Sequence, residues 1–163
     1  MGSVRLSYMN PVDLAALTID DCEPSAISQA WNSLFDWFPY GRHECKRGKG
    51  YGLTYCDAHS GQLTPRQYIA GVEVPRSWRS SDNKFVSQQR FNGGPYSVVQ
   101  YCGTYEEISD AAAIVEKAWQ PPRGATFDDR RPIVTFFHTD PSSTSAGDQI
   151  ADICVPIAVE FVS

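Results

Sequence analysis

The chain contains an internal repeat, in which Ile27-Ser28-Gln29-Ala30 returns 81 residues later as Ile108-Ser109-Asp110-Ala111. The same spacing relates five further pairs without a gap: Phe38 and Trp119, Thr54 and Thr135, Tyr55 and Phe136, Val74 and Val155, and Pro75 and Pro156. Self-similarity at one fixed spacing is typical of a duplicated structural unit. We therefore expect two copies of one unit, and this expectation restricts the fold more than any other feature of the sequence.

The first copy has the pattern strand, helix, strand, strand. Residues 12–19 are rich in strand-forming side chains, and Glu23-Pro24 opens a helix, because proline suits the first helical turn. The helix has one apolar face at helical spacing, made by Ile27, Ala30, Trp31, Leu34 and Phe38. Residues 51–56 and 67–74 are predicted to be the remaining two strands.

The second copy repeats this order. Residues 96–102 are the predicted first strand. Thr104-Tyr105-Glu106-Glu107 then matches a capping box, which predicts one helix running to Trp119. Residues 132–138 and 150–159 are the predicted last two strands.

The predicted fold class is α+β, with two pseudo-symmetric βαββ modules forming a single duplicated domain over residues 1–163. Module one covers about residues 4–75, module two about 95–160, and the polar segment 76–94 connects them. A unit with one helix covers only one face of its sheet, so we expect a central ligand cleft where the two modules meet.

Composition excludes several functions. The net charge of −5 disfavours direct binding to nucleic acid, which needs clustered cations. No stretch approaches the roughly 18–20 apolar residues of a membrane span, and no signal peptide is evident, so a cytoplasmic location is expected. The 5 cysteines lack a CxxC pair, and neither His59 nor His138 shows a paired ligand spacing with Asp57 or Asp140. We predict reduced thiols, no metal and no cofactor.

The strand segment YIAGVEVP, residues 68–75, places the acidic Glu73 among apolar side chains. Strand alternation puts Tyr68, Ala70, Val72 and Val74 on one face, toward the helix, and turns Glu73 to the other face beside Gly71. That face is either wet, with Glu73 solvated, or a partly desolvated aromatic cleft in which Glu73 attracts a cationic or hydrogen-bonding ligand. Gly71 is expected to let a flat ligand approach closely.

Several motifs resemble the GyrI-like family, also described as the AraC-type effector-binding domain and built from tandem SHS2 modules. The resembling stretches are PYSVVQYCGTYEEISDA, RRPIVTFFHTDP, DICVPI, YGLTYCD and YIAGVEVP, and they cover almost the whole chain. The resemblance implies binding of bulky aromatic, often cationic, small molecules between the modules. Members of the family also inhibit DNA gyrase or hydrolyse cyclopropanoid genotoxins. Thr135 and Phe137 stand where the family has a strand glutamate and a tyrosine, which leaves Glu73 as the matching acid.

The predicted function is therefore binding of an aromatic, possibly cationic, small molecule by a stand-alone domain with no helix-turn-helix before it, for sensing or sequestering a xenobiotic. The predicted ligand-binding residues are Glu73, Gly71, Trp37, Tyr51, Trp119, Thr135 and Phe137. One alternative is a hydrolase of strained electrophilic molecules, with Glu73 activating water. The other alternative is a protein interaction such as gyrase inhibition.

Overall fold

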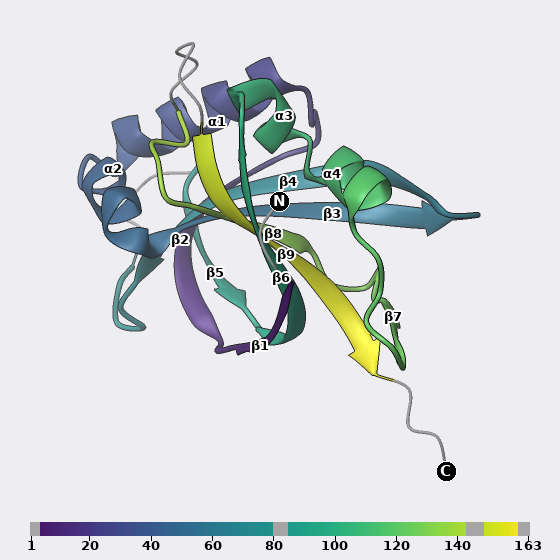
Figure 1. Ribbon diagram of the computed structural model, residues 1–163. Helices are drawn as coiled ribbons and strands as arrows, with labels where there is room; N and C mark the ends of the chain where they lie inside the picture. Colours follow the sequence, from purple (N-terminus) through teal and green to yellow (C-terminus); the bar gives the residue numbers. More distant parts are fainter. Residues whose placement is uncertain (1–3, 80–84, 143–148, 160–163) are drawn as a thin grey trace.

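The computed structural model describes residues 4–79, 85–142 and 149–159 (Figure 1). The elements in chain order are β1 (Arg5–Met9), β2 (Val12–Ile19), α1 (Pro24–Trp37), α2 (Gly41–Glu44), the π-helical turn η1 (Cys45–Lys49), β3 (Gly50–His59), β4 (Gln62–Val74), β5 (Ser87–Phe91), β6 (Gly94–Gly103), α3 (Tyr105–Ser109), α4 (Ala111–Ala118), β7 (Ala125–Phe127), β8 (Ile133–Phe137) and β9 (Gln149–Val159). Every strand predicted from the sequence is present, and the fold class is α+β with a large antiparallel sheet.

The strand order is β1-β6-β9-β8-β3-β4-β2-β5, with β7 added beside β9. The strands β2, β4 and β3 of the first half are therefore matched by β6, β9 and β8 of the second half, in mirrored order about the β3–β8 pair. This order is the one that a duplication of a βαββ unit would produce. The two halves join directly where Tyr51 pairs with Phe136 and Thr54 with Ile133.

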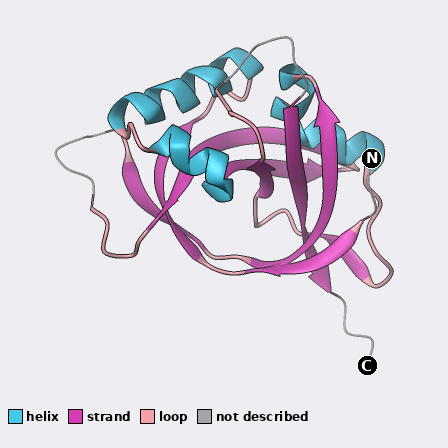
Figure 2. Ribbon diagram, turned by 60° about the vertical axis from the view of Figure 1, so that its left-hand side comes forward, coloured by secondary structure: helices cyan, strands magenta, loops and turns pink. Residues whose placement is uncertain are grey.

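A second junction joins the halves at the outer strands. Arg5 pairs with Val98 in β6, and Ala16 pairs with Ser87 in β5, so β1 and β2 together run antiparallel to β5 and β6. The segment predicted as a polar connector thus contains a strand. Gly93 makes the turn between β5 and β6 with a φ of 70°, and a side chain there would collide with the Met9 carbonyl. Figure 2 shows the strands curving round an interior, with the helices gathered on one side.

The helices follow the predicted patterns with one difference. Helix α1 starts with Pro24 in its first turn and buries the predicted apolar face, with Phe35 buried in place of the partly exposed Phe38. The predicted single helix of the second half is instead two helices, α3 and α4. The chain leaves the helical conformation at Asp110, whose side chain accepts a hydrogen bond from the Ala113 N–H at 3.2 Å and so caps a new helix. The capping box at Thr104 is confirmed.

Three hydrophobic clusters pack on the two faces of the sheet, one of them formed with α4. On the face covered by α1, which we call the helix side, Trp31 Nε1 donates a hydrogen bond of 2.9 Å to the buried Tyr68 hydroxyl. The other face, which we call the inner face, carries the cluster formed by Leu14, Ala16, Tyr51, Leu53, Ile69, Phe91, Tyr96, Val98, Val134 and Cys154.

Among the described helices, none has the length and apolar character needed to cross a membrane.

Candidate functional site

Glu73 lies on the inner face, as the alternation of the strand predicts. It is half-buried in β4, opposite Leu14 of β2, while Tyr68, Ala70 and Val72 belong to the helix-side cluster. In the described part of the chain, no side chain donates a hydrogen bond or forms an ion pair with the Glu73 carboxylate. The carboxylate is therefore available to an external partner on this face.

The inner face around Glu73 is filled by the protein's own side chains rather than forming the open hollow expected from the sequence. Tyr51 is only 7% exposed, and its ring lies 5.1 Å from Phe136 and 6.0 Å from Phe91, measured between centroids. The expectation that Gly71 leaves space for a flat ligand is wrong, because a Cβ at Gly71 would lie 2.9 Å from Leu14 Cδ1. The cluster stays accessible at the partly exposed Glu73 and Phe136.

Tyr51 and Glu73 form an electrostatically linked pair. Burial, and then the nearby negative charge of Glu73, raise the pKa of Tyr51 to about 12. The phenol consequently keeps its proton well above neutral pH. Tyr51 pairs with Gly71, which lies two residues before Glu73 on the same face of β4. A phenol and a carboxylate thus share the inner face at the edge of an aromatic cluster, which is a suitable arrangement for binding a polar group attached to an aromatic ring.

The sequence interpretation missed a second polar group on the same face. His138 Nε2 lies 3.2 Å from Asp152 Oδ2, and Arg5 Nη2 lies 3.5 Å from the same oxygen. The His138 ring also contacts Phe136 edge to face, at 5.9 Å between centroids. Asp152 is in β9, whereas the carboxylate considered from the sequence, Asp140, pairs with Arg42 instead.

We define the inner-face site as Glu73, Tyr51, Phe136, His138, Asp152 and Arg5. The aromatic residues Tyr51 and Phe136 form its centre, and the polar groups lie on both sides of them. It spans the β3–β8 junction and so uses both halves of the chain. Among the described residues, no three His, Cys, Asp or Glu side chains are placed to hold a metal ion.

Thr135 and Phe137 are not part of this site. Both face the helix side, where Thr135 is 2% exposed opposite Gly52 and Ile153, and Phe137 packs edge to face on Trp31 at 5.6 Å. The neighbouring residue Phe136 takes the inner face, because side chains alternate along a strand. The expectation that Thr135 and Phe137 contact the same ligand as Glu73 is therefore corrected.

The two predicted tryptophans also lie away from the inner face. Trp37 ends α1, is 54% exposed, and stacks on Phe85 with 5.9 Å between ring centroids. Trp119 follows α4 and donates a hydrogen bond of 3.1 Å from Nε1 to the Ser97 hydroxyl. Of the predicted set, the structure thus brings together Glu73, Gly71 and Tyr51, and separates the other four.

No family model matches this sequence, and no curated protein sequence matches it significantly. Solved structures do share its fold. A hydrolase from Listeria innocua has a TM-score of 0.62 and 13% identity, over 95% of this chain and 91% of that chain. SAV2435 bound to tetraphenylphosphonium has a TM-score of 0.54 and 12% identity, over 96% and 94%. The EcmrR C-terminal domain has a TM-score of 0.61 and 10% identity, over 96% and 98%. At these identities, the fold is what the chain shares with them.

Proposed function

We propose that the protein is a GyrI-like effector-binding domain that binds an aromatic, positively charged small molecule at the inner-face site. The observation that carries this proposal is the position of Glu73, a half-buried carboxylate on the inner face, two residues along β4 from Gly71, the strand partner of the buried Tyr51. A partly desolvated carboxylate next to aromatic rings attracts an organic cation through charge and through the negative ring faces.

The exposure of the residues indicates how such a ligand would bind. Glu73 and Phe136 are partly exposed, whereas Tyr51 and Phe91 are buried. The ligand would first contact Glu73 and Phe136, and deeper binding would require the Tyr51 ring to turn. Two solved structures of the same fold support a small-molecule role: SAV2435 is bound to tetraphenylphosphonium, an aromatic cation, and EcmrR carries the fold as its C-terminal domain.

A second candidate function, hydrolysis, is favoured by the His138–Asp152 pair. In a neutral imidazole, Nε2 can donate to Asp152 while Nδ1 accepts a proton from water. The protonated Tyr51 would be a proton donor on the other side of Phe136. One structure of this fold is a hydrolase from Listeria innocua. In this reading, His138 rather than Glu73 activates the water.

Titration calorimetry with tetraphenylphosphonium tests the binding proposal, with neutral triphenylphosphine oxide as the comparison. We expect saturable binding of the cation and a loss of about three- to tenfold in affinity for Glu73→Gln, since one partly buried charge pair is removed. Asp36→Asn, an exposed acid on α1, is the matched control. Equal affinity of wild type and Glu73→Gln would contradict the proposal. Product formation from a cyclopropane-bearing electrophile that is lost in His138→Gln would favour hydrolysis.

A further inference from the structure

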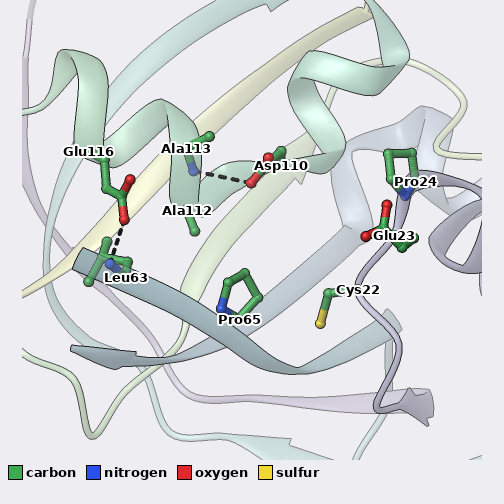
Figure 3. Close-up of a pocket in the computed structure, with 9 residues that line it drawn as sticks. All are labelled: Cys22, Glu23, Pro24, Leu63, Pro65, Asp110, Ala112, Ala113 and Glu116. Carbon is green, nitrogen blue, oxygen red and sulfur yellow. Dashed lines mark hydrogen bonds between the residues drawn. The ribbon is translucent and has the colours of Figure 1, made fainter. Parts of the chain in front are cut away.

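Two pockets lie next to each other along α4, on the side of the sheet opposite the inner-face site. The first has a volume of about 390 Å³ and is lined by Cys22, Glu23, Pro24, Leu63, Pro65, Asp110, Ala112, Ala113 and Glu116 (Figure 3). The second has a volume of about 380 Å³ and is lined by Ala58, Gly61, Gln62, Leu63, Val115, Glu116, Trp119, Pro121, Phe127 and Asp129. They share Leu63 and Glu116, and we call the pair the α4 groove.

The groove exists because one edge of β4 lacks a strand partner. Strand β2 ends at Ile19, opposite Tyr68, so the β4 residues before Tyr68 have no neighbouring strand on that side. The Glu116 carboxylate accepts the Leu63 N–H instead, and Pro65 has no N–H to offer. Helix α4 therefore stands beside an open strand edge, and the space between them is the groove.

The first pocket is strongly acidic. Glu23, Asp110 and Glu116 line it, and in Figure 3 Glu116 and Glu23 lie at opposite ends. None of the described residues lining either pocket is a lysine, arginine or histidine, and none of these carboxylates joins an ion pair within the described chain. The pKa of the Cys22 thiol is raised by burial and then by the surrounding acidic side chains, which is consistent with a negative potential here.

The second pocket adds an apolar wall beside another acid. The Trp119 ring is held by its hydrogen bond to Ser97 and meets the Phe127 ring edge to face, at 6.4 Å between centroids. Asp129 lines the same pocket, and Glu116 lines both pockets. Both pockets of the groove therefore combine carboxylates with hydrophobic surface.

We propose that the α4 groove binds an aliphatic polyamine. Such a molecule carries both ammonium groups and methylene chains, and the groove offers both kinds of partner: the carboxylates of Glu23, Asp110, Glu116 and Asp129, and the apolar surface of Leu63, Pro65 and Trp119. Each pocket lies within the roughly 300–1,000 Å³ typical of small-molecule sites. Trp119 lines the second pocket, and ammonium groups bind favourably against the face of a tryptophan ring.

Calorimetric titration with spermidine tests this site. Glu116→Gln is the informative variant, because the Gln amide oxygen still accepts the Leu63 N–H while the charge is removed. We expect its affinity for spermidine to fall about three- to fivefold, in the range of one partly exposed charge pair. Trp119→Leu should also weaken binding. Neutral 1,8-octanediol should not bind, and 0.5 M salt should weaken spermidine binding through screening.

Two controls separate this site from the inner-face site and from general attraction to an acidic protein. Glu73→Gln should bind spermidine with the affinity of the wild type, although its affinity for tetraphenylphosphonium is expected to fall. Asp36→Asn removes an exposed charge outside both pockets and should also bind like wild type. The proposal is overturned if spermidine gives no saturable binding, if Glu116→Gln binds it unchanged, or if Asp36→Asn weakens it as much as Glu116→Gln does.

Discussion

Tyr51 and Phe136 meet edge to face, with their ring centroids 5.1 Å apart, at the pair of residues that joins β3 to β8. Each ring has a polar group near it, since Tyr51 pairs with Gly71, two residues from Glu73 on the same face, and Phe136 contacts His138. One aromatic contact thus connects the two halves of the chain and also the two polar sides of the proposed ligand site. The proposed ligand site and the junction between the halves therefore share these two rings.

Replacing Phe136 by leucine tests the proposed contact between this ring and the ligand. The variant loses the ring that is proposed to contact the ligand, so tetraphenylphosphonium affinity should fall by a factor of about 2–12, corresponding to an aromatic pair of about 0.5–1.5 kcal/mol. Calorimetry measures the affinity. Phe127→Leu removes a ring on the other side of the sheet and should bind the cation like wild type. The same loss in both variants would show that the effect is not local to the inner face.

Alkaline pH should destabilise the protein through Tyr51. Its folded-state pKa is raised to about 12, above the value of about 10 for a tyrosine in the unfolded chain. The unfolded state then loses its proton first, so the stabilisation is complete below about pH 10 and is lost as pH rises toward about 12. Urea unfolding at several pH values measures this effect. The free energy of unfolding should fall less steeply with rising pH in Tyr51→Phe than in the wild type. Tyr68 and Tyr96 are present in both proteins and contribute equally to the pH dependence. Equal pH dependence of the free energy of unfolding in the two proteins would therefore refute the role of Tyr51.

Gly52→Ala should destabilise the fold strongly. A Cβ at Gly52 would collide with the Tyr68 hydroxyl and lie 3.2 Å from Phe137 Cε2, inside the helix-side cluster. Overpacking of this kind costs about 1–3 kcal/mol of the free energy of unfolding. Tyr68→Phe removes the colliding oxygen at the expense of the hydrogen bond from Trp31. Chemical denaturation measures the free energy of unfolding of both single variants and of the double variant. The loss in the double variant should be smaller than the sum of the losses in the two single variants.

Arg131→Lys should lower stability far more than Arg130→Lys. The Arg131 guanidinium donates hydrogen bonds to the carbonyls of Pro95 at 2.9 Å and Ile157 at 2.6 Å, and its Cζ lies 4.8 Å from the centroid of the Tyr96 ring. A lysine cannot reproduce this planar set of contacts, so a loss of about 2–4 kcal/mol is expected. Arg130 is 87% exposed, and its replacement should change the melting temperature little. Equal melting temperatures would contradict this assignment.

Local patterns predicted the elements of this fold well. The alternation in YIAGVEVP placed Glu73 opposite the helix-facing side chains, and the proline and capping-box signals located the starts of α1 and α3. The break at Asp110 was missed because an apolar stripe at helical spacing continues across it. An aspartate can cap a new helix without interrupting that stripe.

The composition of the site was harder to predict, because it depends on register between distant strands. His138 and Asp152 are neighbours only because β8 lies beside β9 with Phe136 opposite Asp152. No local signal gives that register. The filling of the inner face could not be predicted for the same reason. The side chain that covers Gly71 is Leu14 of β2, which is distant in the sequence. Thr135 and Phe137 were assigned from the resemblance, whereas alternation from the inner-facing Phe136 places both on the opposite face.

The exchange of outer strands has a consequence for how the molecule comes apart. β1 belongs to the first half of the chain yet pairs with β6, and β5 leads into the second half yet pairs with β2. Separating the two halves would break the β1–β6 and β2–β5 pairs in addition to the β3–β8 pair. Despite its duplicated order, the chain should melt as one cooperative unit, and either half produced alone would expose bare strand edges and aggregate.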